Sequence, residues 1–193
     1  MNIYPDLDKN NASLVVIDIQ QKLAAAISSE DLHALLRKVI NLVECARLLD
    51  LPVIVTEQYP QGLGRTLPMI GEAVYRCSPD IQFVPKKRFS CAGVPEFDGW
   101  LRDHGRRQLI ITGIETHVCV FATARDLARQ GYSVHVPRDA VTSRSESNHS
   151  NGLSLIERAG GIVTNSETVI FDLLKVAEGD AFKAMSKLIK QTV

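Results

Sequence analysis

The sequence lacks the features that mark disulfide scaffolds, metal centres and membrane proteins. Its 193 residues include four cysteines at irregular spacings with no CxxC pair, which argues against a disulfide framework and a structural zinc site. No apolar run approaches the ~18 residues that a membrane span needs. The polar N-terminal segment has no apolar core of a signal peptide. We therefore expect a protein of the reducing cytoplasm that does not enter a membrane.

The sequence also lacks an excess of charge of either sign. Lys plus Arg and Asp plus Glu both number 22, so the net charge is zero and the basic footprint of a nucleic-acid-binding protein is missing. The first predicted strand is followed by the residues DIQQ at 18–21, not by the glycine-rich turn of a nucleotide site. We expect a small-molecule substrate and no nucleic acid partner.

Predicted strands and helices alternate along the chain. Continuous apolar runs, typical of parallel strands covered on both faces, predict strands at 14–18, 52–57, 81–84, 109–112, 132–136 and 162–163. Helical patterns occupy residues 28–50, 95–104, 118–130, 143–159, 167–174 and 180–190. Gly113 is expected to end the fourth strand, and residues 164–167 read as a capping box. The pattern predicts one three-layer α/β domain over residues 1–193 with a six-stranded, mainly parallel sheet.

One long connection interrupts this alternation. Residues 58–80 are rich in proline and glycine, and only one short helix is expected there, near 70–75. Connections of this length in a compact domain are often lids or binding loops. The sequence leaves open whether this segment or a neighbouring subunit closes a pocket.

Three side chains of compatible chemistry lie at the ends of predicted strands. Asp18 ends the first strand, Lys86 follows the third, and Cys119 lies in the first turn of the helix after the fourth. The carboxyl ends of parallel strands share one edge, where α/β sheets bind ligands. There a carboxylate can accept a thiol proton, and a helix N-terminus and an ammonium are expected to lower the pKa of the thiol. Each residue alone has a plainer explanation, as a strand cap, a solvated charge or a core thiol.

The sequence around these three positions resembles a known family. The segments DIQ at 18–20, KxRFS at 86–90 and GIETHVC at 113–119 are similar to motifs of the isochorismatase-like cysteine hydrolases. That superfamily includes nicotinamidases and N-carbamoylsarcosine amidases. The resemblance covers about residues 13–174, and the segment TEQYPxGLGRT at 56–66 and Glu115 are most similar to the isochorismatase-domain-containing subgroup.

The resemblance implies a role for each motif residue. Cys119 would be the nucleophile, Asp18 the general base and later the acid, and Lys86 their positive partner. The peptide bond between Ile114 and Glu115 would be cis, and the backbone N–H groups of Glu115 and Cys119 would form an oxyanion hole. The implied reaction is hydrolysis of a small amide or related C–N bond through a thioester. Family members are commonly homo-oligomers, so we expect one here.

The resemblance also bears on cofactors and on the pocket. Nicotinamidases carry an Asp-x-His metal cluster after the second strand, but residues 56–80 contain no histidine, so we expect no catalytic metal and no cofactor. Tyr59 and Phe89 could equally pack in the core, and His117 is more typical of a structural role. The candidates for lining a substrate pocket are Gln20, Gln58, Tyr59, Phe89 and His117.

Two other functions stay open at this stage. One is metal-independent ether hydrolysis of the isochorismatase kind, with Asp18 as the proton donor. The other is a non-catalytic member of the fold that binds a metabolite or a protein.

Overall fold

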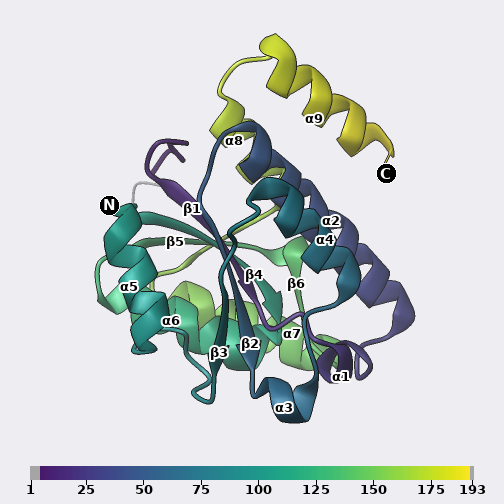
Figure 1. The fold of residues 1–193 in the computed structure, drawn as a ribbon, viewed down its shortest axis with the longest axis vertical. Helices are drawn as coiled ribbons and strands as arrows, with labels where there is room; N and C mark the ends of the chain where they lie inside the picture. The colour runs from purple at the N-terminus through teal and green to yellow at the C-terminus, as the bar shows by residue number, and fades with distance from the viewer. Residues whose placement is uncertain (1–4, 192–193) are drawn as a thin grey trace.

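A parallel sheet forms the middle layer of the computed structural model, which describes residues 5–191 (Figure 1). Its strands follow the order β3-β2-β1-β4-β5-β7, and the short β6 pairs with β4. Every registered strand pair is parallel. The strands are β1 (Ala12–Ile17), β2 (Val53–Gln58), β3 (Phe83–Lys86), β4 (Gln108–Ile114), β5 (Ser133–Pro137), β6 (Val141–Thr142) and β7 (Ile162–Thr164).

The three-layer fold with a mainly parallel sheet is confirmed. The six predicted strands correspond to the six strands of the main order, and no end is displaced by more than two residues. The seventh strand, β6, was not predicted, because a two-residue strand shows no periodicity in a sequence. β3 starts and ends two residues later than expected, so Lys86 is its last residue.

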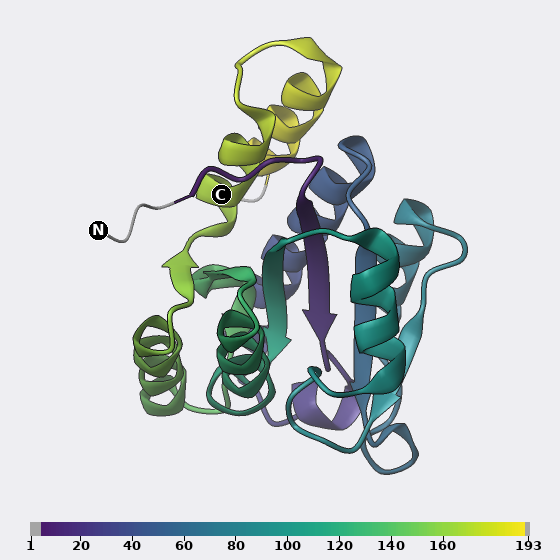
Figure 2. The same ribbon diagram turned by 90° about the vertical axis from the view of Figure 1, so that its left-hand side faces the viewer.

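Helices cover both faces of the sheet. Side chains of β1 alternate between two hydrophobic cores: Leu14 and Val16 face one, whereas Val15 and Ile17 face the other. This double burial explains the continuous apolar run of the strand. The first face is covered by α2 (Ser29–Leu48), α4 (Pro68–Cys77) and α8 (Ser166–Leu174), and α9 (Gly179–Gln191) packs against α2 and α8. The second face, turned toward the viewer in Figure 2, is covered by α5 (Pro95–His104), α6 (Phe121–Arg129) and α7 (Glu146–Arg158).

The long connection after β2 is more ordered than its composition predicts. It contains α3 (Pro60–Leu63) and all of α4, whose Ile70 and Val74 are buried in the first core. Its first half is fastened near the end of β1, where Leu67 N–H donates to Ile19 O at 2.9 Å and Gln21 N–H donates to Arg65 O at 3.1 Å. The prediction of a single short helix is therefore wrong. The other short helix near this edge is α1 (Gln21–Ala24).

Gly113 does not end β4, as the sequence analysis expected, but lies inside it. Its φ is +126°, and a Cβ atom there would lie 1.9 Å from the carbonyl oxygen of Ile17. Glycine at this position therefore permits β1 and β4 to approach closely at the edge that carries the candidate site.

Two predicted helix starts are also wrong. Cys119 lies in a π-helical turn, η1 (Thr116–Val120), that precedes α6, not in the first turn of an α-helix. The predicted capping box at 164–167 does not form, since the N-cap of α8 is Asn165 and its side chain makes no capping bond. Instead, Asp139 accepts hydrogen bonds from the N–H and hydroxyl of Ser166 at 2.7 and 2.6 Å. Asp139 lies in a 3-10 turn, η2 (Arg138–Ala140). A local sequence pattern does not reveal such a distant acceptor.

Candidate active site

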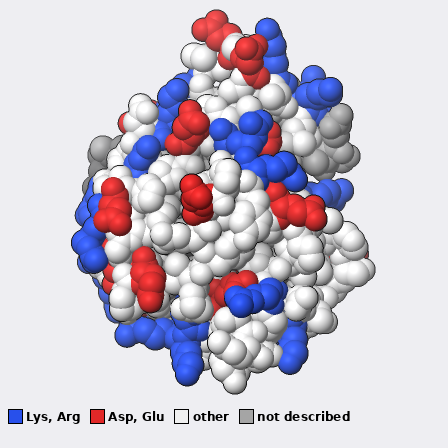
Figure 3. Space-filling view, viewed as in Figure 1, with Lys and Arg blue, Asp and Glu red and all other residues white. Residues whose placement is uncertain are grey.

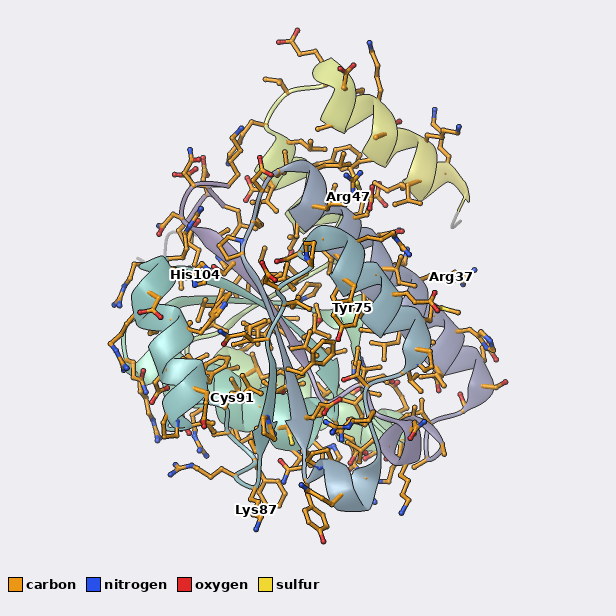
Figure 4. All side chains as sticks on the ribbon, in the orientation of Figure 1. Arg37, Arg47, Tyr75, Lys87, Cys91 and His104 are labelled. Carbon is orange, nitrogen blue, oxygen red and sulfur yellow. The ribbon has the colours of Figure 1, made fainter. Side chains whose placement is uncertain are left out.

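Asp18 and Lys86 form a buried ion pair at the carboxyl edge of the sheet, which is the lower edge in Figure 1. The ammonium nitrogen of Lys86 lies 2.6 Å from Oδ2 of Asp18, and both side chains are fully buried. They come from the two strands on either side of β2, because Asp18 follows β1 directly and Lys86 ends β3. The adjacent Lys87 is exposed and points away from the fold (Figure 4).

Cys119 joins this pair through Asp18. Its thiol lies close enough to Asp18 and Lys86 for both charges to act on its ionisation, and only 5% of the residue is exposed. The other oxygen of Asp18, Oδ1, accepts a hydrogen bond from the hydroxyl of Thr56 at 2.8 Å. The structure thus brings together the three side chains that the sequence singled out: Asp18, Lys86 and Cys119.

The charges of this cluster set the protonation state of the thiol. Burial raises the pKa of Cys119 well above its ordinary value, and the negative charge of Asp18 raises it further, while Lys86 opposes both. The expected lowering of this thiol pKa is therefore wrong. Burial alone would lower the pKa of Lys86, but Asp18, Cys91 and Cys119 together outweigh it, and the net pKa is raised. The site thus places a thiol whose ionisation is disfavoured beside a buried ion pair.

Thr56 and Cys91 complete the surroundings of Asp18, and the sequence analysis missed both. Thr56 lies on β2 and pairs in register with Ile17, the residue before Asp18. The sulfur of Cys91 lies 3.8 Å from the Thr56 hydroxyl, and the Cys91 N–H donates to Thr123 of α6 at 3.0 Å (Figure 4 labels Cys91). Burial raises the pKa of Cys91 to about 11. The sequence signal that could have identified Thr56 is its place near the carboxyl end of the predicted strand 52–57, at the same edge of the sheet as Asp18.

Side chains of the turn that carries Cys119 form an ion pair and a hydrogen bond with the segment that follows β6. The peptide bond between Ile114 and Glu115 is cis, as the resemblance implies. The Glu115 carboxylate is bound by Arg144 on both oxygens, through Nε at 3.0 Å and Nη2 at 2.9 Å. His117 Nδ1 lies 3.0 Å from the hydroxyl of Ser143. The imidazole of His117 is thus paired with a structural neighbour, and its predicted contact with a substrate stays a prediction.

The remaining predicted pocket residues differ in exposure. Gln20 is fully buried, and its amide bonds the backbone of Gln58 and Gly64. Gln58 Oε1 accepts a hydrogen bond from Lys86 at 2.8 Å. Tyr59 and Phe89 are 49% and 62% exposed, which excludes packing of these rings in the core. Their contact with a substrate stays a prediction.

A cavity of about 480 Å³ lies away from this cluster, on the α4 side of the sheet. None of Asp18, Lys86 and Cys119 lines it. The residues that line the cavity are Glu57, Arg65, Thr66, Pro68, Gly71, Glu72, Tyr75 and Phe83.

Within residues 5–191, no group of three or more His, Cys, Asp and Glu side chains is arranged to hold a metal ion. In the same part of the chain, no helix has the length and apolar character needed to cross a membrane.

Comparison with known proteins identifies the family. Residues 12–168, most of the chain, match the family model described as the isochorismatase domain. The chain belongs to the isochorismatase family. At the level of that family, this isochorismatase-fold protein is a hydrolase, and the names of its relatives do not fix a substrate.

Three relatives illustrate the breadth of the isochorismatase family. Isochorismatase domain-containing protein 2A of Mus musculus is 36% identical, with 93% of this chain and 83% of the relative aligned. A secreted isochorismatase effector, Isc1, of Phytophthora sojae is 36% identical, with 94% and 86% aligned. The structure of a protein named MAR1 ribonuclease from Caenorhabditis elegans is 35% identical with a TM-score of 0.88, and covers 96% of this chain and 93% of its own.

Proposed function

We propose that this protein is a cysteine hydrolase that cleaves a small amide or related C–N bond through a thioester, without a metal. The observation that carries the proposal is the position of the Cys119 thiol within the influence of a carboxylate that is itself paired with Lys86. A nucleophile close to a base, with the base held by a third group, is the arrangement that covalent catalysis uses.

The raised pKa of Cys119 decides how the first step proceeds. The proton of Cys119 moves to Asp18 while the sulfur attacks the carbonyl carbon, so no thiolate has to exist beforehand. The oxyanion is received by the backbone N–H groups of Glu115 and Cys119. The C–N bond then breaks, and the proton on Asp18 passes to the departing amine.

The second half of the reaction regenerates the enzyme. Asp18 takes a proton from water as the water oxygen attacks the thioester carbonyl. The C–S bond breaks, the proton returns to sulfur, and a carboxylic acid leaves. Throughout, the buried ammonium of Lys86 stabilises the negative charge on Asp18 between the proton transfers.

The test is a panel of small primary and secondary amides with release of ammonia or amine as the readout. We expect turnover by the unchanged protein and none by Cys119→Ala with an intact circular dichroism spectrum. Mass spectrometry of quenched reactions should show an acyl adduct on the peptide that contains Cys119. Turnover that survives Cys119→Ala would refute the covalent mechanism, and turnover of a vinyl ether without an adduct would favour the ether hydrolase.

Two other activities are tested beside the amide panel: RNA cleavage and binding without catalysis. The ribonuclease name belongs to the C. elegans protein, and here the charges are balanced, with acidic and basic side chains interspersed on the face shown in Figure 3. We expect no cleavage of single-stranded RNA. A protein that binds a metabolite but turns over no panel member would support the binding role.

We also propose a homo-oligomer in the cytoplasm. Net charge of zero gives little repulsion between copies, and Met69 and Tyr75 of α4 are more than half exposed. Light scattering of the purified protein should give a mass that is a multiple of 21.3 kDa. A mass of a single chain across the micromolar range would contradict this.

A further inference from the structure

The ammonium of Lys86 is held by more than its ion pair. Its nitrogen lies 2.6 Å from Oδ2 of Asp18 and 2.8 Å from Oε1 of Gln58. Two carbonyl oxygens, those of Phe89 and Arg88, lie at 3.2 and 3.3 Å. An ammonium group has three N–H bonds, so these acceptors use its whole capacity to donate. Lys86 therefore acts on the site as a positive charge at a fixed point.

Gln58 is itself fixed in one orientation. Its side-chain nitrogen donates to the carbonyl of Lys87 at 2.9 Å, which turns its oxygen toward Lys86. Its backbone N–H donates to Oε1 of Gln20 at 2.7 Å, and its carbonyl accepts from Nε2 of Gln20 at 3.0 Å. Gln20 is fully buried and also donates to Gly64 O at 2.6 Å. A chain of hydrogen bonds thus runs from Gln20 through Gln58 to Lys86.

We propose that Gln58 is a positioning residue that holds the Lys86 ammonium at its place beside Asp18 and Cys119, and that Gln20 holds Gln58. In this assignment the two glutamines act through Lys86 and do not contact the substrate. The effect on turnover rests on the proposed cysteine hydrolase function, whereas the placement of Lys86 does not.

The physical reason lies in the balance of charge on the thiol. Lys86 is the group that lowers the pKa of Cys119 against burial and Asp18. Coulomb interactions inside a protein change steeply with distance. An ammonium that loses one acceptor and moves away from the sulfur therefore makes ionisation of the thiol less favourable.

The first experiment observes Lys86 directly, without a substrate. Lysine-selective ¹H–¹⁵N spectra, assigned with Lys86→Arg, should show a slowly exchanging ammonium signal in the unchanged protein. Gln58→Leu, which keeps the side-chain size but removes the acceptor, should speed proton exchange at least tenfold or abolish the signal. Gln58→Glu keeps an oxygen acceptor and should retain the signal, and the exposed Gln61→Leu on α3 is the matched control. An unchanged signal in folded Gln58→Leu would overturn the proposal.

The second experiment measures the thiol. Alkylation of Cys119 by iodoacetamide at pH 7.5, followed by peptide mass spectrometry, should slow about fivefold in Gln58→Leu and stay within twofold in Gln61→Leu. If Gln58→Leu does not fold, Gln58→Asn replaces it, because its shorter side chain withdraws the acceptor. Unchanged alkylation in either folded variant would contradict the proposal.

Turnover of an amide from the panel then separates positioning from substrate contact. Gln58→Leu should lower kcat with KM within twofold, whereas a raised KM with unchanged kcat would mean that Gln58 touches the substrate. If the unchanged protein hydrolyses no amide, the proposed function fails, and the ammonium signal and the alkylation rate still decide the role of Gln58.

Discussion

The carboxylate of Asp18 forms an ion pair with the ammonium of Lys86, with 2.6 Å between Oδ2 and the ammonium nitrogen, and its charge also acts on the thiol of Cys119. Because the carboxylate raises the pKa of the thiol while the ammonium lowers it, ionisation and catalysis should respond oppositely when the carboxylate is removed. This relationship leads to the first prediction.

Asp18→Asn should make Cys119 easier to alkylate and the enzyme slower. Removing the negative charge lowers the pKa of the thiol and leaves Lys86 unopposed, so iodoacetamide should react faster at pH 7 than in the unchanged protein. Amide turnover should fall by about 10²–10⁴-fold, because the general base is lost. Peptide mass spectrometry and amine release measure the two rates.

The exposed Asp103 on α5 gives a matched control, because Asp103→Asn should change neither rate. Slower alkylation in Asp18→Asn would contradict the view that its charge opposes ionisation of Cys119.

Lys86→Met should lower the free energy of unfolding by about 3–5 kcal/mol. The variant leaves the buried Asp18 carboxylate without its cation, and an uncompensated buried charge is costly. Urea denaturation followed by circular dichroism measures the loss. Lys87→Met, at an exposed neighbour, should change stability by less than about 0.5 kcal/mol.

The double variant Asp18→Leu with Lys86→Met tests the same pair in another way. Since it removes both charges, it should be more stable than Lys86→Met alone. A double variant that is less stable than the single one would show that the ion pair is not the source of the loss.

Gly113→Ala should cost about 3 kcal/mol or more, or prevent folding. The added Cβ would lie 1.9 Å from the Ile17 carbonyl oxygen, and φ at +126° disfavours any side chain. Thermal and urea unfolding measure the change. Gly71→Ala is the control, because nothing lies within 4 Å of its added Cβ, and there the helical propensity of alanine should raise stability by about 0.5–1 kcal/mol.

Stability should fall as the pH decreases from about 6.5 to about 4, in part because of His135. Burial lowers the pKa of His135 from 6.5 to about 4, and Asp172 opposes this only partly. Between these two pH values His135 is protonated in the unfolded chain but not in the folded protein. Its contribution to the free energy of unfolding is therefore present above pH 6.5 and is lost on acidification, by up to about 3 kcal/mol.

Urea denaturation at pH 7, 6, 5 and 4.5 tests this. His135→Gln should flatten the dependence of the unfolding free energy on pH, whereas His33→Gln, at an exposed histidine, should leave it unchanged. A curve for His135→Gln as steep as that of the unchanged protein would assign the dependence to other groups.

Several features of this protein could be read from local sequence. Continuous apolar runs such as residues 14–17 predicted the strands because burial on both faces leaves no room for alternation. The edge position of Asp18, Lys86 and Cys119 followed from strand ends and the rule that parallel strands share a carboxyl edge. These inferences depend only on residues close in the chain and on general topology.

The tertiary structure decided what depends on partners far apart in the chain. The sequence predicted a lowered pKa for Cys119 from its turn and from a lysine, whereas burial and the carboxylate of Asp18, 101 positions away, reverse the shift. The amide of Gln58 could be expected to meet a substrate until its bonds to Lys86 and Lys87 were seen. Gly113 reads as a strand break, but the approach of Ile17 makes it part of the strand. Ionisation, hydrogen-bond pairing and close contact are set by what surrounds an atom, and packing brings those surroundings from distant segments.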